Sequence, residues 1–283
     1  MKKIIKNFNN LIQRTIFKVQ NKTNSNLNIS NFNKYLISFI AILFIYLFYL
    51  LTPLLYSKAW LQTSIEDKLL NEFKMNLSTS ANISYRILPA PHFLIKDSKI
   101  LVDKGKKKKS IAEIKDFQVF LYQKNLFNKK KLNIKKIVIN NANFSLLRSD
   151  LKLLNKFKKE KFSKKKIEIN NSNIFFKDNL EEIIFIIKID KTDLFFDNKK
   201  LSNFLSLKGE VFNIPFIFDF NGRNDSINYE KINFSLKKIK LNISNESTIK
   251  KELTLGENNI SFLTSTINTK YSVREKLIIF KSN

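Results

Sequence analysis

The hydrophobic positions of this chain change their spacing near residue 75, and the change separates two kinds of structure. Between Tyr35 and Tyr56 the sequence is continuously apolar, with 22 residues that include no Asp, Glu, Lys or Arg. As a helix this run would be about 33 Å long, enough to cross a hydrocarbon core of about 30 Å. The pattern therefore predicts a transmembrane helix over residues 35–57. A cleaved signal peptide is the alternative, but its apolar region is usually only about 7–15 residues long.

The charges on either side of the apolar run predict its orientation. Residues 1–34 contain seven lysines or arginines and no acidic residue, whereas three lysines are balanced by three acids between Lys58 and Lys74. Flanks rich in lysine and arginine stay in the cytoplasm. We therefore expect a basic cytoplasmic tail at residues 1–34. The rest of the protein would lie on the far side of the membrane, which in a Gram-negative cell means that the helix crosses the inner membrane and the β-rich domain is periplasmic.

Residues 58–75 are predicted to form a connecting helix, because Leu61, Ile65, Leu69 and Phe73 recur every four residues and share one face. From residue 76 to residue 283 the apolar residues instead recur at every second position. Many strands with one apolar face and one Lys, Asn or Ser face predict a long, twisted antiparallel β-sheet. One helical interruption is expected at Asp150–Lys161, and Asn221–Gly222 is expected to lie at a hairpin turn. The predicted fold class is therefore mainly β.

Two further features of the strand region concern how the strands are arranged. At several points the apolar alternation slips by three residues, which indicates either a β-bulge or a break between two strands. These slips separate Ile114 from Phe117, Ile134 from Ile137, and Leu236 from Ile239. In addition, the sequence 137–144 is echoed thirty residues later at 167–174. The echo is a hint of stacked strand–turn–strand hairpins.

Composition argues against most kinds of catalytic site. The net charge is +27, cysteine is absent, and His92 is the single histidine. A lone histidine is usually structural, so we expect no metal site, no cofactor and no enzyme activity. The lysine runs at Lys106–Lys109, Lys129–Lys131 and Lys164–Lys166 fall at predicted turns and strand ends. Such runs keep loops solvated and protect sheet edges, or contact anionic headgroups, so nucleic acid is not an expected partner.

The order of these features resembles the AsmA family of bacterial inner-membrane proteins. The resemblance covers roughly Tyr35 to Arg148 and depends on order, since no single motif is diagnostic. Its elements are the membrane helix, the connecting helix Ser57–Lys74, a strand ending at Leu88-Pro89-Ala90-Pro91, the apolar stretch His92–Val102, residues 111–114 leading to Phe117–Leu121, and residues 136–144.

The resemblance implies a curled, open sheet with an apolar concave face, in proteins linked to outer-membrane assembly and to phospholipid passage. Family members are usually longer than this chain. About a dozen strands spaced at about 4.8 Å would give roughly 58 Å of sheet. The candidate residues lining a lipid groove are Ile83, Tyr85, Ile87, Phe117, Val119, Leu121, Ile137, Ile139, Phe216, Phe218, Phe220, Ile232, Phe234 and Leu236.

Taken one by one, the same residues fit the ordinary core of a closed β-sandwich better, because periodicity alone does not distinguish a filled core from a lipid track. In that alternative the protein would be a membrane-anchored scaffold that binds a protein partner in the cell envelope. Its layout would be similar to the anchored jelly-roll component of lipopolysaccharide export. The cross-section of the sheet, open or sealed, discriminates between the two.

Overall fold

The computed structural model describes residues 31–80, 82–104, 107–151, 160–223, 228–250, 253–274 and 277–282. The chain divides into two units, Met1–Tyr49 and Leu50–Asn283. Residues 1–30 of the predicted cytoplasmic tail and the central part of the helix expected at Asp150–Lys161 lie outside the described residues, whereas residues 31–34 of the predicted tail are helical.

The first unit contains most of the apolar helix α2 (Asn31–Leu51), which the one-turn helix η1 (Thr52–Leu55) follows. Together, residues 32–55 form one helix long and apolar enough to cross a membrane. Most of its large side chains are exposed, including Phe39 and Ile45. A core helix would bury such side chains, whereas a helix surrounded by lipid leaves them facing outward.

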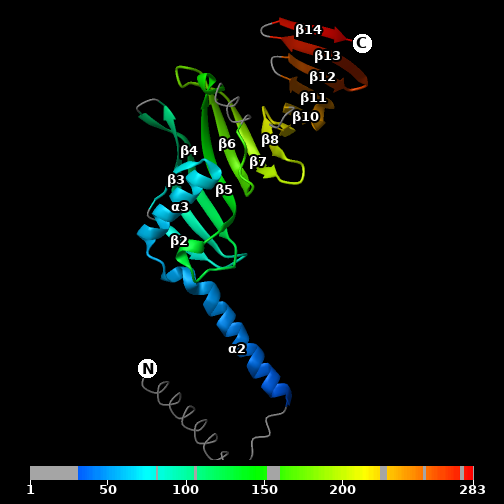
Figure 1. The fold of residues 1–283 in the computed structure, drawn as a ribbon. Coiled ribbons are helices and arrows are strands. Elements are labelled where there is room, and N and C mark those ends of the chain that lie inside the picture. Colours follow the sequence, from blue (N-terminus) through cyan, green and yellow to red (C-terminus); the bar gives the residue numbers. More distant parts are fainter. Residues whose placement is uncertain are drawn as a thin grey trace, which may run out of the picture. The chain divides into compact units, whose positions relative to one another are not determined.

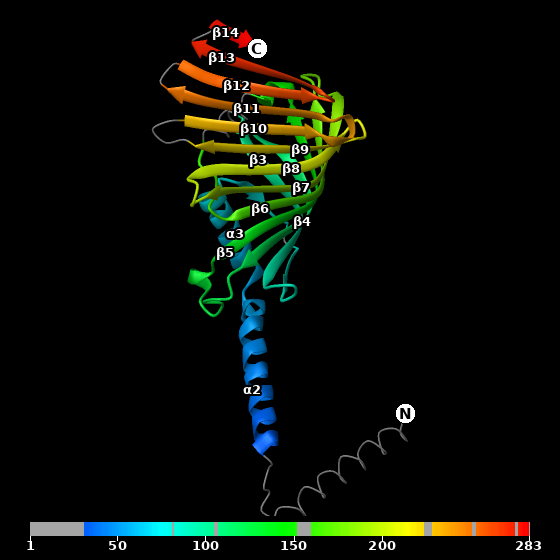
Figure 2. The same cartoon turned by 90° about the vertical axis from the view of Figure 1, so that its right-hand side faces the viewer.

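The second unit consists of helix α3 (Lys58–Phe73) and one sheet of 14 strands, shown in Figures 1 and 2. The sheet is not closed, and β1 and β14 lie at its two ends. The mainly β fold class is therefore confirmed, and a sealed sandwich is not formed by the described strands. The strands are β1 (Asn76–Ser78), β2 (Ile83–Arg86), β3 (His92–Lys104), β4 (Lys107–Leu121), β5 (Ile134–Leu147), β6 (Lys166–Lys177), β7 (Ile183–Asp197), β8 (Ser202–Val211), β9 (Ile214–Arg223), β10 (Asn228–Leu236), β11 (Leu241–Lys250), β12 (Leu253–Phe262), β13 (Ser265–Arg274) and β14 (Leu277–Ser282).

Strands β5 and β6 form a parallel pair, whereas the other described strand pairs are antiparallel. These two strands contain the sequence echo. Ile137 pairs with Ile167 and Asn140 with Asn170, so residues thirty apart lie side by side. The expectation of stacked hairpins was wrong. The echo marks two whole neighbouring strands, and matching side chains stack across a parallel pair because their register is constant.

A line of backbone irregularities crosses the sheet from β3 to β7. Asp97, Asn141 and Asn171 have positive φ angles of 53°, 55° and 47°. Lys115 and Asp190 occupy the corresponding places in β4 and β7, where the regular pairing also skips a residue. Asn and Asp tolerate the left-handed conformation better than most residues. The aligned irregularities therefore give these strands a common bend.

The three predicted slips have different outcomes. Ile114 and Phe117 belong to the continuous strand β4, with the skipped residue Lys115 between them. A register shift, the signature of a bulge, accompanies the slip from Ile134 to Ile137 in β5. The slip after Leu236 is a break instead, because the helical turn η4 (Lys237–Ile239) reverses the chain between β10 and β11.

The hairpin expected at Asn221–Gly222 was misplaced. Both residues lie within β9, paired with Phe204 and Asn203, and β9 continues to Arg223. Gly222 is required for packing rather than for a turn, because a Cβ atom there would lie 2.6 Å from the ring of Phe220.

Candidate lipid-binding face of the sheet

The strand register places apolar side chains in rows that cross the sheet on one face, here called the inner face. Directly paired residues share a face, so a row can be followed from strand to strand. The first row runs from β2 to β13 and is interrupted by a single polar residue. It consists of Ile83, Ile95, Phe117, Ile139, Ile169, Thr192, Leu207, Phe218, Phe234, Ile243, Ile260 and Ile267.

A second row runs beside the first from β2 to β10 and then becomes polar. Its apolar members are Tyr85, Phe93, Val119, Ile137, Ile167, Leu194, Leu205, Phe220 and Ile232. In β11 and β12 the row continues as Asn245 and Asn258, whose side chains are hydrogen-bonded at 2.6 Å; Asn245 also donates to Tyr271 Oη at 2.8 Å. The apolar part of the inner face is therefore wide up to β10 and narrower beyond it.

Helix α3 closes the inner face over the first strands. Its residues Leu61, Ile65, Leu69 and Phe73 are buried, as their spacing predicts. Leu61 and Ile65 face Phe93, Val119 and Ile134 across a cavity of only about 10 Å³. A gap of that size is at the lower limit for a single water molecule. This part of the inner face is therefore a filled hydrophobic core.

Polar contacts fix α3 in this position. Glu66 Oε1 accepts hydrogen bonds from the backbone N–H and the hydroxyl of Thr79, at 2.9 and 2.7 Å. At the other end of the helix Glu72 forms an ion pair with Lys165, which directly precedes β6. The helix is thus tied to both sides of the covered region.

Beyond β5 the inner face is more open. No described helix covers β8–β14 in Figure 2, and Leu207, Phe218, Ile232 and Phe234 remain partly exposed. Partly exposed apolar side chains can bury further surface against a ligand, which is favourable because it removes apolar area from water. From β6 to β13 the first row extends about 34 Å at about 4.8 Å per strand.

One described segment outside the strands packs on this open part. Phe162 forms a buried cluster with Phe196 and Phe220, and the partly buried side chains that pack against this cluster are Leu194, Leu205, Phe218 and Ile232. The side chain of buried Asn203 holds the segment: its Oδ1 accepts from the N–H of Phe162 at 2.9 Å, and its Nδ2 donates to the carbonyl of Glu160 at 2.7 Å. The Phe162 cluster therefore covers part of the second row and one side of Phe218, while Phe218 and Phe234 of the first row remain partly exposed.

The predicted lining residues accordingly fall into two groups. Ile83, Phe117, Val119, Leu121, Ile137 and Ile139 are buried in the covered region, where Tyr85 and Ile87 are half-buried. Phe216, Phe218, Phe220, Ile232, Phe234 and Leu236 lie on β9 and β10, in the open region. The predicted lining residues therefore do not form one continuous open groove, because α3 covers the first group. Within the second group Phe216 and Phe220 are buried as well, so only Phe218, Ile232, Phe234 and Leu236 are partly exposed to a ligand.

Sequence reasoning missed residues that complete the open surface. Ile169, Leu205, Leu207, Ile243 and Ile260 lie in the two rows beside the predicted residues. Their alternation was visible in the sequence. Their places in the rows depend on strand register, which the alternation alone does not define.

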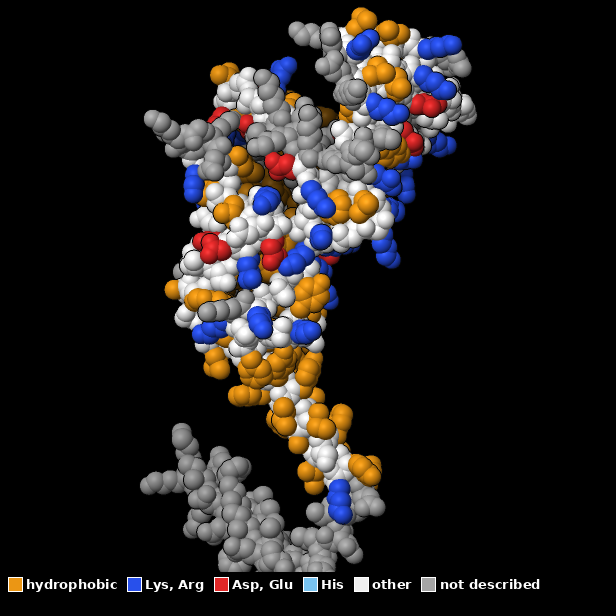
Figure 3. Space-filling view, viewed as in Figure 1, with side chains coloured by type: hydrophobic (Ala, Val, Ile, Leu, Met, Phe, Trp, Pro, Cys, Tyr) orange, Lys and Arg blue, Asp and Glu red, His pale blue; other side chains and the backbone are white. Residues whose placement is uncertain are grey.

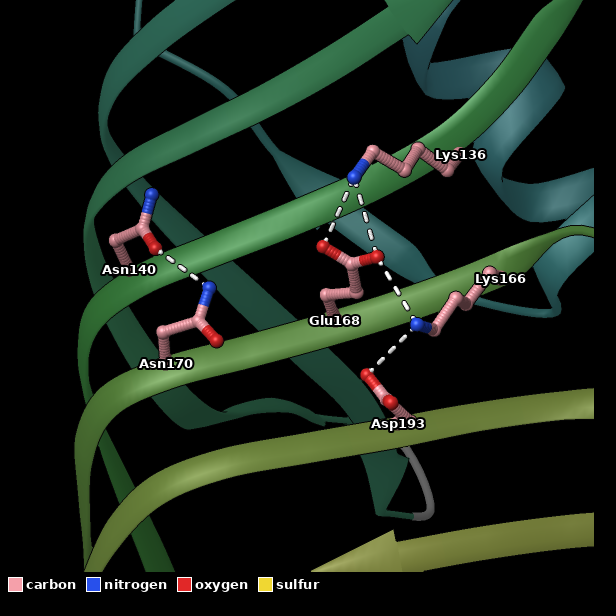
Figure 4. Close-up of polar contacts among 6 residues, drawn as sticks. All are labelled: Lys136, Asn140, Lys166, Glu168, Asn170 and Asp193. Carbon is pink, nitrogen blue, oxygen red and sulfur yellow. Dashed lines mark hydrogen bonds and ion pairs between the residues drawn. The ribbon is translucent and has the colours of Figure 1, made fainter.

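The opposite, outer face is polar and is held by ladders of side chains between strands. Figure 4 shows Glu168 of β6 between Lys136 and Lys166, with Lys136 Nζ 3.1 and 3.0 Å from its two oxygens. Lys166 Nζ lies 3.1 Å from Glu168 and 3.1 Å from Asp193 of β7. Asn170 donates to Asn140 at 3.0 Å. These contacts join β5, β6 and β7 across the boundary between covered and open regions.

The electrostatics of this ladder follow from its geometry. Burial alone would raise the pKa of Glu168, but hydrogen bonds from Lys136 and Lys166 outweigh it and hold the pKa below its usual value. Burial would lower the pKa of Lys166, yet its bonds to Asp193 and Glu168 raise it. The ladder therefore favours the charged forms, as expected of a structural network.

His92 lies on the outer face, where its ring stacks on Phe120 with centroids 4.8 Å apart and its Nδ1 is 2.7 Å from the carbonyl oxygen of Ala90. Within the described residues no group of three or more His, Cys, Asp or Glu side chains is placed to hold a metal ion.

A scan of protein-family models gives no match to the chain, and no curated protein matches it in sequence. The resemblance to the AsmA family therefore stays a prediction. The fold and the two-part inner face are the features from which function can be argued.

Proposed function

We propose that this chain is a membrane-anchored envelope protein, similar to the AsmA family, that shields phospholipid acyl chains on the open part of its inner face. In this proposal the N-terminus is cytoplasmic, α2 crosses the inner membrane, and the sheet lies in the periplasm. The protein would support outer-membrane biogenesis without catalysis. Phospholipid would be its main partner, with an envelope protein as a further possible contact.

The observation that carries the proposal is the partly exposed first row on β8–β10. Leu207, Phe218 and Phe234 are paired neighbours there, and the row continues over Ile243 and Ile260. Covering a CH₂ group of an acyl chain contributes about 0.8 kcal/mol. The row of about 34 Å exceeds the roughly 15 Å hydrocarbon depth of one leaflet, so it offers room for the whole length of an acyl chain.

The surroundings of the row suit a lipid that has a polar headgroup. The second row is polar from β11 onward, where Asn245, Asn258 and Tyr271 form a hydrogen-bonded group. An acyl chain on the first row would have this polar band alongside it. Because the inner face under α3 is filled, the lipid would contact the sheet beyond β5.

Photo-crosslinking of the full chain in cells tests the proposal. A photoreactive residue is placed at Phe218 or Phe234 on the open row, and at Asn233, the outer-face neighbour of Phe234, as a matched control. We expect phospholipid adducts at 218 and 234 and few at 233. A fourth probe at Phe117, which is 0% exposed beneath α3, should give none. Equal labelling at 233 and 234, or adducts at 117 but not at 218, would contradict the proposal.

A further inference from the structure

Large apolar side chains are exposed at the end of the second unit where the apolar span terminates. Leu54 and Leu55 of η1 are 55% and 77% exposed. Leu88, in the turn after β2, is 80% exposed, and Phe127, in the loop between β4 and β5, is 60% exposed. Figure 3 shows hydrophobic side chains gathered at the lower end of the strand-rich unit. Exposed apolar side chains from three separate segments call for an explanation.

Direct contacts hold the three segments together. The hydroxyl of Tyr56, which directly follows η1, donates to the carbonyl of Leu126 in the β4–β5 loop. The hydroxyl of Tyr85 in β2 donates to the carbonyl of Leu50 at 2.7 Å. The end of the apolar span is thereby fixed to β2 and to the β4–β5 loop. The apolar side chains on those segments consequently lie near the level at which the span ends.

The charged side chains on these three segments are all basic. Lys58, Lys124, Lys129 and Lys131 are exposed, and the Lys129 ammonium lies 5.2 Å from the centre of the Tyr56 ring. The segments 50–65, 82–96 and 121–133 contain no Asp or Glu. Tyr56 and Trp60 pack edge to face with ring centroids 5.6 Å apart. Apolar side chains, lysines and aromatic rings together are typical of a surface that sits in the headgroup region of a bilayer.

We propose that η1, the turn at Leu88 and the β4–β5 loop form a membrane-docking surface for anionic phospholipid headgroups. Leu54, Leu55, Leu88 and Phe127 enter the interfacial layer, while the lysines contact lipid phosphates. The surface holds the first strands against the membrane through contacts additional to α2. The single helix α2 by itself would leave the sheet free to rotate relative to the membrane. This inference does not depend on what the open inner face binds.

Site-specific fluorescence in the full chain tests it, helped by the absence of cysteine from the sequence. Single cysteines replace Leu88 or Phe127, with Leu180 and Phe212 as controls in the turns after β6 and β8. The controls are matched in exposure, at 81% and 75%. Each variant is labelled with an environment-sensitive dye. It is then reconstituted in vesicles of phosphatidylcholine, with or without phosphatidylglycerol.

We expect nitroxide-labelled lipid to quench the dyes at 88 and 127 several-fold more than those at 180 and 212, with iodide in the water showing the reverse order. In the double variant Lys129→Gln/Lys131→Gln the lipid quenching should fall in vesicles with phosphatidylglycerol and change little without it. Equal quenching at all four positions would overturn the docking surface. Quenching at 88 and 127 that ignores both lipid charge and the lysine changes would overturn the headgroup contact.

A protein partner in place of lipid would also be visible. If a second copy covered this surface, the spectra of the dyes at 88 and 127 would depend on protein concentration and not on lipid nitroxides, which would also overturn the proposal. The experiment is separable from the crosslinking at Phe218. Docking can fail while lipid adducts on the open row persist, and the adducts can be absent while docking holds.

Discussion

The inner face of β2–β5 and that of β8–β10 have the same apolar pattern but different surroundings. Phe117 and Phe218 occupy the same row, yet Phe117 is completely buried in the region that α3 covers, whereas Phe218 packs only on one side against the Phe162 cluster and stays partly exposed. One side chain belongs to a core and the other to a surface. The comparison teaches that hydrophobic alternation defines which face is apolar, whereas the element that covers this face determines its role.

The largest expected effect is on stability in the covered region. Phe117→Ala leaves a cavity in a filled core and should lower the free energy of unfolding by about 3–5 kcal/mol. Phe218→Ala removes a half-exposed ring and should cost only about 1 kcal/mol. Denaturant unfolding of the full chain in detergent, followed by circular dichroism of the sheet, measures both. If Phe117→Ala and Phe218→Ala lowered the free energy of unfolding by similar amounts, the distinction between a covered core and an open surface would be wrong.

A smaller effect is expected where the Phe162 segment covers part of the open region. Asn203→Ala removes the acceptor for the N–H of Phe162 and the donor to Glu160, both in a buried site. The loss of stability should be about 1–3 kcal/mol. If the segment is released, lipid crosslinking from a probe at Phe220 should also increase. Ser206→Ala, which removes an outer-face hydrogen bond to Asp219 on the same strand pair, is the control. Unchanged crosslinking at Phe220 in the Asn203 variant would show that the segment is not a cover.

The smallest expected effect concerns the outer-face ladder that joins the two regions. The pKa of Glu168 is held below the ordinary value of 4.5, so the folded state gains stability from its charged form above that pH. This gain is lost as the pH falls through the lowered pKa. Glu168→Gln should therefore cost up to about 1 kcal/mol near neutral pH and less under acid conditions.

Thermal unfolding of the full chain between neutral and acidic pH measures the effect of Glu168→Gln. The exposed carboxylate Glu113, paired with Lys99, provides the comparison through Glu113→Gln, which should change stability less because both partners face solvent. A difference between wild type and Glu168→Gln that does not shrink on acidification would indicate that the charge of Glu168 is not what stabilises the ladder.

Much of the fold could be predicted from the sequence because the relevant signals are local. The apolar run and the four-residue spacing of Leu61, Ile65, Leu69 and Phe73 are properties of one segment, and both helices are present. Alternation in the strand region likewise gave a mainly β structure. Local signals failed where two segments had to be related. The parallel pairing of β5 with β6 is an example, since neither strand contains information about the direction of its neighbour.

The candidate site was only half predictable for the same reason. Phe117 and Phe234 each lie between two polar residues, so the sequence does not distinguish them. Their different exposure arises because α3 packs on the strand that contains Phe117 and not on the strand that contains Phe234. That packing is a tertiary property, and the contact that anchors α3 through Glu72 joins residues 93 positions apart.

The parallel pairing of β5 and β6 has a consequence for how the two regions are kept apart. A hairpin cannot connect parallel neighbours. After the 14 residues of β5 the chain must therefore return to the end of the sheet at which β5 began before β6 can start. The end of that return crossing includes Phe162 and Lys165, one on the open rows and the other bonded to α3. The parallel pairing of β5 and β6 thus places the end of the return segment, here called the partition, between the covered and the open regions of the sheet. Reversing β6 to make an ordinary hairpin would remove this partition along with the ladder at Glu168.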